Sequence, residues 1–414
     1  MSLKIIHTAD WHLGQTFFGY DREEEHDAFL NWLVDTLEEQ QTDVLLIAGD
    51  VFDVANPSAS AQHRFFRFLR EANRRCPKLQ IVIIAGNHDS AARLEAPVPL
   101  LEELNTTITG IIRRKEDGTI DFDSLLIPLY NKQSEEEALC LAVPYLRQGD
   151  YPPSEEEDTT YVGGVTRMYQ QLAAYAKEKC SACEALIAMG HLHATGSELS
   201  DDDRSERVIM GGLESVSTAA FGEELAYTAL GHIHKAQRIG GKENIRYSGS
   251  PLPMSFSEKN YRHQVVAIHI EKGKVGNIIP LEIPLLAPLR RIPERPAAPE
   301  EVLLQLAGLP LADEACDKKC MPYLEVQVLL TEPDPSFRHK VEEVLEDKAV
   351  RLTTIVPSYP EREDKTETTL LSCTDLQKID PLDMLRHTFT NRYGGELPEE
   401  LEHLFNDVIR EVSQ

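Results

Sequence analysis

The sequence lacks the long apolar runs that a membrane protein needs. Its 414 residues contain no run of about 18 or more apolar residues, the length of a membrane-spanning helix. The N-terminus, Met1 to His7, enters a strand-like pattern directly, without the charged region, apolar stretch and cleavage site of a secretory signal. We therefore expect a soluble, cytoplasmic protein.

Cysteine is also scarce. Seven cysteines, an odd number spread thinly over a long chain, argue against a disulfide scaffold and for a reducing compartment. Cys180 with Cys183, and Cys316 with Cys320, have spacings that suit a shared structural zinc ion. Because no further Cys or His stands at zinc-ribbon spacing beside either pair, ordinary thiols are the favoured interpretation and a zinc site is the alternative.

Basic residues are few relative to acidic ones. The chain has 42 Lys and Arg against 69 Asp and Glu, which gives a net charge of −27 at pH 7. Affinity for nucleic acid comes mainly from Lys and Arg that neutralise phosphates, so this charge argues against tight DNA binding by the chain alone. Divalent cations bound by the protein, or a partner with a basic groove, would offset the repulsion between this chain and the phosphates of DNA.

Short apolar strands alternate with amphipathic helices through the first 285 residues. Such alternation predicts a layered α/β core with helices on the faces of the sheets, and chemistry at the loops where strands end. The periodicity favours strands at Lys4–Thr8, Asp43–Ala48, Gln80–Ala85, Ala185–Met189 and Ala226–Leu230, and helices at Arg22–Glu39 and Ala61–Asn73.

Prolines crowd together at Ile283–Glu300, and we place a domain boundary there. Beyond it, the pattern predicts helices at Pro299–Ala307 and Pro335–Glu346, strands at Tyr323–Leu330 and Ala349–Val356, and two amphipathic helices at Pro381–Arg392 and Pro398–Val412. The expected division is 1–285 for the core domain, 286–356 for a small α+β domain, 357–379 for a polar linker or long loop, and 380–414 for a helical segment that binds a partner.

Five polar clusters stand where predicted strands end. A single such cluster is usually a cap or a loop hydrogen-bonder, but five clusters of Asp, Asn and His would cost several kcal/mol per buried ionised group without partners. A metal centre removes that cost. The clusters are Asp10-Trp11-His12, Gly49-Asp50-Val51-Phe52-Asp53, Gly86-Asn87-His88-Asp89, Gly190-His191-Leu192-His193 and Gly231-His232-Ile233-His234.

The donor types in these clusters narrow the kind of metal site. Carboxylate, amide and imidazole without thiolate suit manganese, iron or zinc in open coordination. About seven ligands are too many for one ion, whereas two ions bridged by a carboxylate and a water fit in-line phosphoryl displacement. Glycines before Asp50, Asn87, His191 and His232 let the backbone turn sharply and come close to the ions.

The series D-x-H, G-D-x-F-D, G-N-H-D, G-H and G-H-I-H resembles the calcineurin-like metallophosphoesterase superfamily. More narrowly, Thr8–Gly14, Ala48–Asp53, Ala85–Ser90 and Tyr247–Pro251 are similar to the SbcD family of bacterial nucleases of double-strand-break repair. The likeness covers nearly the whole chain. It implies a layered α/β/β/α core, a small α+β capping domain and C-terminal helices.

The resemblance also implies the ligands of two divalent ions, with Mn²⁺ preferred and Mg²⁺ or another divalent ion as the alternative. Asp50 would bridge the ions, and His191 is preferred to His193 because the family ligand follows the glycine directly; His193 is then a supporting or solvent-facing residue. The implied sets are Asp10, His12, Asp50 and His234 for one ion, and Asp50, Asn87, His191 and His232 for the other.

His88 follows a ligand in sequence, and its family counterpart acts on the scissile phosphate by stabilising charge or donating a proton. Asp89 either orients the His88 ring or is a plain turn residue, and the sequence leaves both open. Some archaeal relatives have a second histidine three residues after the bridging aspartate, where this chain has Asp53. No role can be transferred to Asp53.

The implied activity is a metal-dependent DNA nuclease that hydrolyses phosphodiesters with a two-metal-activated water. It would act as exonuclease and endonuclease on double-strand ends and hairpins, in DNA repair, recombination and replication. The implied partners are DNA and an SbcC-type coiled-coil ATPase, with a homodimer of this chain in a heterotetramer. No G-x-x-x-x-G-K-[ST] motif occurs, so control by ATP would come from the partner.

Three other functions compete with this one. A protein Ser/Thr phosphatase would carry an arginine after the second cluster, where Val54-Ala55-Asn56 stands, and G-N-H-E where this chain ends in Asp89. A small-molecule or cyclic-nucleotide phosphodiesterase is the more serious alternative, although such enzymes often end near the core domain. A catalytically inactive scaffold would have lost ligands, and here none is missing.

Overall fold

The computed structural model describes residues 2–153, 160–179, 185–198, 215–312 and 318–360, together with single positions between 382 and 405. By their contacts, the residues divide into two compact units. The first comprises Met1–Arg291, Leu311–Glu325 and Ala349–Thr354, and the second comprises Ile292–Pro310, Val326–Lys348 and Ile355–Gln414.

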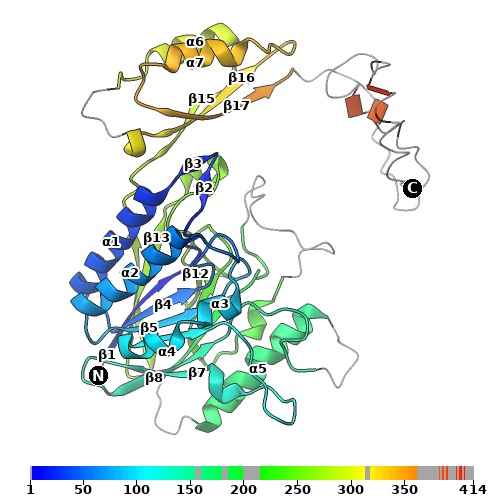
Figure 1. The fold of residues 1–414 in the computed structure, drawn as a ribbon. Helices are drawn as coiled ribbons and strands as arrows, with labels where there is room; N and C mark the ends of the chain where they lie inside the picture. Colours follow the sequence, from blue (N-terminus) through cyan, green and yellow to red (C-terminus); the bar gives the residue numbers. More distant parts are fainter. Residues whose placement is uncertain are drawn as a thin grey trace. The chain divides into compact units, whose positions relative to one another are not determined.

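Two six-stranded sheets form the body of the first unit (Figure 1). In the first sheet, of order β14-β13-β1-β4-β5-β6, strands β1, β4, β5 and β6 are parallel, and β13 and β14 add an antiparallel edge. Its strands are β1 (Ser2–Thr8), β4 (Val44–Ala48), β5 (Gln80–Ile84), β6 (Thr106–Thr109), β13 (Gln264–Glu271) and β14 (Lys274–Glu282).

The second sheet has the order β11-β12-β10-β9-β8-β7, with β8, β9, β10 and β12 parallel and antiparallel strands at both edges. Its strands are β7 (Leu126–Tyr130), β8 (Glu136–Ala142), β9 (Ala185–His191), β10 (Leu225–Gly231), β11 (Gln237–Arg238) and β12 (Ile245–Tyr247). Strands β9 and β10 end in the histidine clusters noted above.

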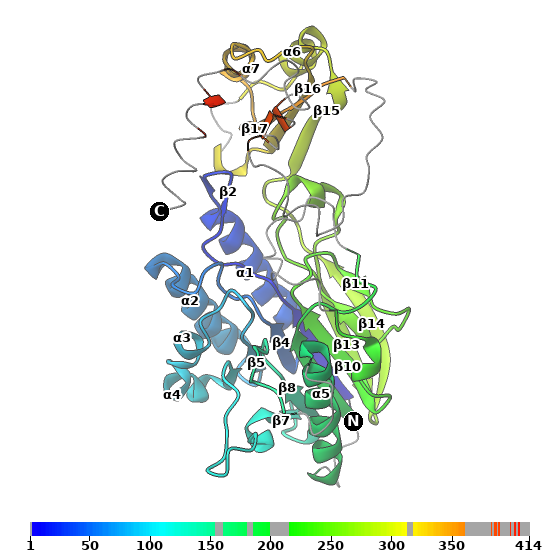
Figure 2. The ribbon, with the colours of Figure 1, turned by 90° about the vertical axis from the view of Figure 1, so that its right-hand side faces the viewer.

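The two sheets pack face to face, with helices on their outer faces (Figures 1 and 2). Helices α1 (Glu23–Glu39) and α2 (Ala59–Arg75) pack on the first sheet, and α5 (Tyr161–Lys179) packs on the second. The layered α/β core predicted from the alternating strands and helices is therefore confirmed, as is the α/β/β/α order that the resemblance implied.

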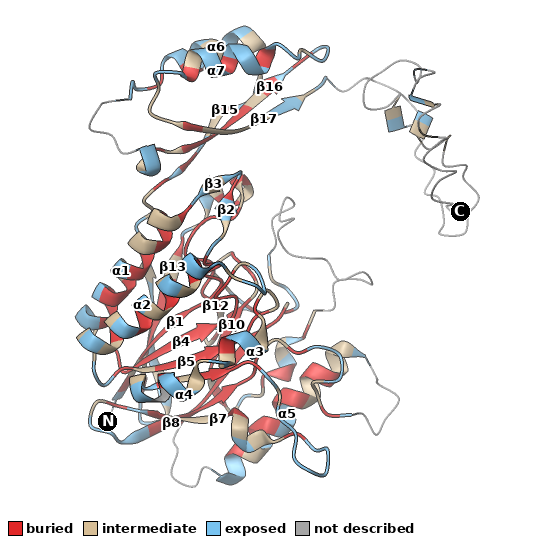
Figure 3. Ribbon diagram, in the orientation of Figure 1, coloured by how far each residue is buried: buried red, intermediate tan, exposed pale blue. Residues whose placement is uncertain are grey.

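Strand β4 contributes side chains to the hydrophobic cores on both faces of its sheet. All five of its residues are buried, as expected for a parallel strand covered on both faces. Alternate side chains point to opposite faces, so Leu45 and Ile47 join the core under α1 and α2. Val44, Leu46 and Ala48 join the core between the sheets, and Figure 3 shows this continuous burial.

Short elements complete the first unit and connect its strands. The elements are β2 (Thr16–Phe17), β3 (Tyr20–Asp21), α3 (Ala91–Glu95), α4 (Val98–Leu101) and the 3₁₀ helices η1 (Glu102–Leu104), η2 (Phe122–Leu125), η3 (Thr218–Ala220), η4 (Phe256–Asn260) and η5 (Lys318–Cys320).

A three-stranded sheet of order β15-β16-β17 and two helices follow the core. The expected strands and helices are present as β16 (Tyr323–Leu329), β17 (Arg351–Ser358), α6 (Pro299–Ala307) and α7 (Phe337–Leu345). Strand β15 (Leu289–Ala297) was missed, because its prolines were interpreted only as a boundary. It lies at an edge of the sheet, where a strand tolerates residues that cannot donate a backbone hydrogen bond.

Most of the expected linker at 357–379 and of the two expected C-terminal helices lies outside the described residues. Strand β17 extends into the linker range as far as Ser358. Arg386 and Glu402, one from each expected helix, form an ion pair. Of the paired cysteines, only Cys320 is among the described residues, and no helix in the described part of the chain is long and apolar enough to cross a membrane.

Candidate metal centre

The polar clusters come together at the carboxyl ends of the central strands of both sheets. Asp10 follows β1, Asp50 follows β4 and Asn87 follows β5, while His191 ends β9 and His232 follows β10. Because the strands are parallel within each sheet, their last residues meet at one edge. We call Asp10, His12 and His234 the aspartate end of the centre, and Asn87, His191 and His232 the asparagine end.

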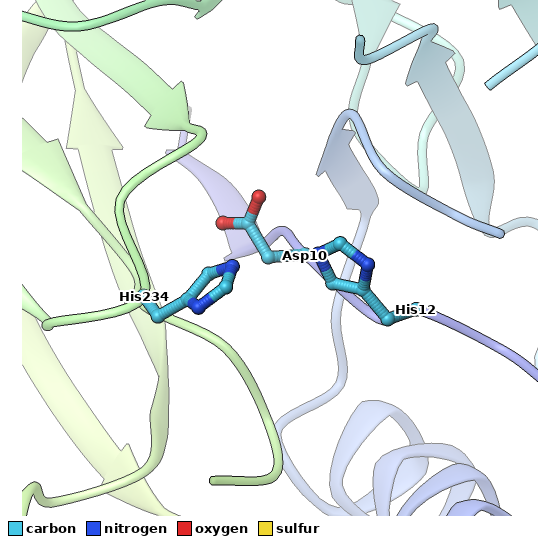
Figure 4. Close-up of side chains that lie close together, drawn as sticks. All are labelled: Asp10, His12 and His234. Carbon is cyan, nitrogen blue, oxygen red and sulfur yellow. The ribbon is translucent and has the colours of Figure 1, made fainter. Parts of the chain in front are cut away.

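At the aspartate end, donor atoms of Asp10, His12 and His234 lie within 4.8 Å of one another (Figure 4). The rings of His12 and His234 are 5.2 Å apart and nearly perpendicular. His12 Nε2 lies 3.7 Å from Asp50 Oδ2. Asp50 is thus within reach of this group.

At the asparagine end, Asn87 Oδ1 lies 2.9 Å from His191 Nε2 and 3.0 Å from His232 Nδ1. Asp50 Oδ2 lies 3.2 Å from the same nitrogen of His191. Neighbouring donor atoms around an octahedral ion with bonds of about 2.1 Å are about 3 Å apart. The distances from His191 Nε2 to Asn87 Oδ1 and Asp50 Oδ2 match this spacing. Asp50 is therefore close to donors at both ends of the centre.

The buried polar atoms of the centre that have no hydrogen-bond partner among the described residues include Asp10 Oδ2, Asp50 Oδ2 and His12 Nε2. Buried polar atoms are nearly always hydrogen-bonded, because leaving them without a partner costs about 1–3 kcal/mol each, and more for a charge. A divalent cation between these atoms would satisfy all three. The residues present therefore fit a metal site.

The charges of the centre are strongly interdependent. Although burial opposes ionisation, the His191 imidazole holds the pKa of Asp50 well below its ordinary value. Burial alone would lower the pKa of His191, but Asp50 overcomes it and raises that pKa to about 10. Without metal, the proton on His191 supplies the positive charge that balances Asp50, and a cation would take its place.

Backbone strain concentrates in these loops. Asp10, His12, Asp50 and His232 have φ angles of 55°, 45°, 49° and 99°, in the left-handed region that non-glycine residues rarely occupy. Such strain persists where the surrounding structure enforces it, and it clusters at functional sites.

Gly49 and Gly86, two of the expected glycines, are required for different structural reasons. Gly49 has a φ of +89°, so it makes the sharp turn before Asp50. Gly86 has no such angle, but a Cβ there would lie 2.1 Å from Asp50 Oδ1. At Gly86 the close approach of the two loops, rather than a turn, requires glycine.

His88 is fixed by two hydrogen bonds. Its backbone N–H donates to Asp50 Oδ1 at 2.9 Å, and its ring Nδ1 donates to the carbonyl of Asp53 at 2.8 Å. A carbonyl can only accept, so Nδ1 carries a proton and Nε2 is the nitrogen left to exchange one. The ring lies 4.9 Å from that of His12, which places His88 beside the centre.

Asp89 does not hydrogen-bond the His88 ring in the described contacts; its carboxylate binds backbone instead. Oδ1 accepts from Phe52 N at 3.0 Å, and Oδ2 accepts from Val51 N at 3.2 Å and Gly86 N at 2.9 Å. Burial and the nearby Asp50 raise the pKa of Asp89 to about 6. Asp89 thus ties the loop after β4 to the loop after β5, and the carbonyl of Asp53 orients the His88 ring.

His193 stands apart from the converging side chains. It is half-buried, and its Nε2 lies 3.0 Å from Ser197 Oγ. The preference for His191 rests on the family pattern and stays a prediction; the Nε2 of His191 lies close to Asn87 and Asp50.

Sequence reasoning missed one residue of the centre. Glu258, in η4, is fully buried, and its Oε1 lies 3.2 Å from His234 Nδ1. Its other oxygen accepts from Met254 N at 2.8 Å, and the interaction with His234 lowers the pKa of Glu258 although burial opposes this. The surrounding sequence is not a motif, so only the tertiary contact identifies Glu258.

Comparison with known proteins identifies two family matches. Residues 3–236 match the calcineurin-like phosphoesterase family, and residues 286–393 match a family described as the type 5 capsule protein repressor C-terminal domain. The first match contains the polar clusters and the central strands of both sheets.

Three relatives are named as the SbcD component of the nuclease SbcCD. The Rhodobacter capsulatus protein is 38% identical over 366 residues, covering 87% of this chain and 88% of the relative. The Escherichia coli K12 protein is 35% identical over 300 residues, covering 69% of this chain and 70% of the relative. The Bacillus subtilis protein is 32% identical over 279 residues, covering 66% of this chain and 67% of the relative.

Proposed function

Because the chain belongs to the calcineurin-like phosphoesterase family, among proteins named as the SbcD component of SbcCD nucleases, we propose that it hydrolyses the phosphodiester bonds of DNA with divalent metal ions. The observation that carries the proposal is the convergence of the aspartate and asparagine ends on Asp50, with three buried polar atoms that a cation would satisfy. The names of the relatives favour a nuclease over a small-molecule phosphodiesterase.

In this proposal one ion is held by Asp10, His12, Asp50 and His234, and the other by Asp50, Asn87, His191 and His232. The position of Asp50 supports a bridging role, because Oδ2 lies 3.7 Å from His12 Nε2 and 3.2 Å from His191 Nε2. We propose Mn²⁺ as the working ion, since carboxylate, amide and imidazole donors suit it; Mg²⁺ is the alternative to be compared.

Two divalent ions bound here would supply Lewis-acid stabilisation of the phosphate and a water of lowered pKa. The chain itself contributes proton transfer at His88, whose Nδ1 is held by the Asp53 carbonyl. In its protonated form, His88 can donate the Nε2 proton to the leaving oxygen or stabilise charge on the phosphate. The Ala48 carbonyl, 2.9 Å from His191 Nδ1, fixes that ring so that Nε2 faces the centre.

The direct test is cleavage of two substrates by the full-length protein with Mn²⁺ or Mg²⁺. End-labelled hairpin DNA and bis(p-nitrophenyl) phosphate are incubated with the protein, alone and with its ATPase partner. We expect hydrolysis of the chromogenic diester and cleavage of DNA. Hydrolysis of the diester without DNA cleavage, even with the partner, would instead support the small-molecule phosphodiesterase.

We also propose an SbcC-type coiled-coil ATPase as the partner, with two copies of this chain in a heterotetramer in the cytoplasm. The relatives' names support a partner, and the net charge of −27 calls for a basic surface elsewhere to hold DNA. Truncation after Lys378 should leave diester hydrolysis intact and abolish co-purification with the ATPase. Full binding by the truncated chain would place the anchor elsewhere.

A further inference from the structure

Two carboxylates outside the proposed ligand set contact histidines of the aspartate end. Asp53 Oδ1 lies 3.3 Å from His12 Nδ1, and Glu258 Oε1 lies 3.2 Å from His234 Nδ1. In both cases the carboxylate faces Nδ1, through an ion-pair contact in His12 and through a hydrogen bond in His234, which leaves Nε2 for a metal. In His12 this Nε2 is the atom 3.7 Å from Asp50 Oδ2.

At the asparagine end, the nearest partner of His191 is of another kind. His191 Nδ1 donates to the neutral carbonyl of Ala48 at 2.9 Å, and its distance to Asp10 Oδ1 is 4.0 Å. The Nδ1 of His232 lies 3.0 Å from the neutral amide oxygen of Asn87. Apart from the shared Asp50, the proposed donors at this end would be neutral once bound to a metal, and the closest partner of His191 Nδ1 is the neutral Ala48 carbonyl.

A carboxylate on Nδ1 strengthens a histidine ligand in two ways. It holds the proton on Nδ1, which fixes the ring and keeps the lone pair of Nε2 directed at the metal, and it makes that nitrogen more basic. It also adds negative charge close to the cation, in an environment where charges are screened less than in water. Loss of such a partner typically weakens metal binding by about 10- to 100-fold.

We propose that Asp53 and Glu258 are positioning residues that make the two ion sites unequal. The aspartate end, with Asp10, Asp53 and Glu258 as its carboxylates, binds its ion first and tightly. The asparagine end binds the second ion more weakly and exchanges it. This inference rests on the proposed two-metal function.

Two substitutions remove the charge of these carboxylates and leave the neighbouring contacts in place. Asp53→Asn removes the charge beside His12 but keeps the main-chain carbonyl that holds His88. Glu258→Gln removes the charge beside His234 and can keep an oxygen for Met254 N. Asp43→Asn is a matched control. Like Glu258, Asp43 is a buried carboxylate that binds backbone N–H groups, in this case those of Lys4 and Lys132. It precedes β4, whereas the metal centre lies beyond the other end of that strand.

The experiment is calorimetric titration of full-length, metal-free protein with Mn²⁺, without substrate. We expect two binding classes in the wild type. Asp53→Asn and Glu258→Gln should weaken the tighter class by about 10- to 100-fold and leave the weaker class within about threefold. Asp43→Asn should leave both unchanged, and Asn87→Ala should remove the weaker class alone.

Several results would overturn the inference. Two equal sites in the wild type would do so, as would loss of the tighter class in Asn87→Ala or unchanged tight binding in Asp53→Asn. If Glu258→Gln does not fold, Asp53→Asn still decides, because that side chain is 30% exposed and its change opens no buried cavity. Absence of any Mn²⁺ binding would defeat the proposed function itself, whereas two equal sites would defeat only their proposed inequality.

Discussion

Replacing Asp89 by asparagine should loosen the two loops that carry Asp50 and Asn87. In the wild type, the Asp89 carboxylate accepts from Val51 N, Phe52 N and Gly86 N at 3.2, 3.0 and 2.9 Å. An asparagine has one accepting oxygen, so its amide nitrogen must face at least one of these N–H donors.

The magnitude follows from the number of bonds lost. In the better orientation, the amide oxygen takes the place of Oδ2 and keeps the bonds to Val51 and Gly86, while the bond to Phe52 N is lost. A hydrogen bond to a charged group contributes about 1.5–3 kcal/mol, which is about a 10- to 100-fold change in an opening equilibrium. The opposite orientation would lose two bonds.

Hydrogen exchange read by mass spectrometry measures this locally. Peptides spanning 48–53 and 85–90 should exchange about 10- to 100-fold faster in Asp89→Asn, while the control Asp43→Asn should change only peptides containing Lys4 or Lys132. Because the loosened loops hold Asp50 and Asn87, Mn²⁺ binding should weaken as well. Unchanged exchange in both loop peptides would refute the role assigned to Asp89.

Three further predictions concern the centre itself. Asp50→Asn should lower metal content at both ends, because it removes the shared anion; elemental analysis showing two retained ions together with wild-type turnover would contradict the bridge. His88→Asn should keep two Mn²⁺ per chain while turnover falls by roughly two to four orders of magnitude, and loss of an ion would make His88 a ligand. Because Asp50 raises the pKa of His191 to about 10, a metal must displace its proton at lower pH, so Mn²⁺ affinity in chelator competition should rise about tenfold per pH unit between about pH 6 and 8; a flat profile would contradict the assignment.

The layered core and the convergence of the polar clusters could be predicted from the order of the amino acids. Strand β4 illustrates the reason: a run of five apolar residues is too short for a typical helix and fits a strand covered on both faces, and Asp50 follows it after Gly49. Parallel strands bring their carboxyl ends to one edge, so residues after β1, β4 and β5 had to meet. The assignment of individual ligands stays a prediction that came from the resemblance, and the division into domains stays a prediction that came from the prolines and the pattern of elements.

The contacts that hold the side chains of the centre could not be predicted, because they join residues that are far apart along the chain. The prolines of β15 prevented its prediction as a strand, because the local sequence does not show that this strand lies at the edge of a sheet. Asp89 looked equally like a partner of His88 or a turn residue until its bonds to two loops were visible. Glu258 reaches His234 from 24 residues away along the chain, and nothing in its local sequence marks a carboxylate whose role depends on a contact formed by folding.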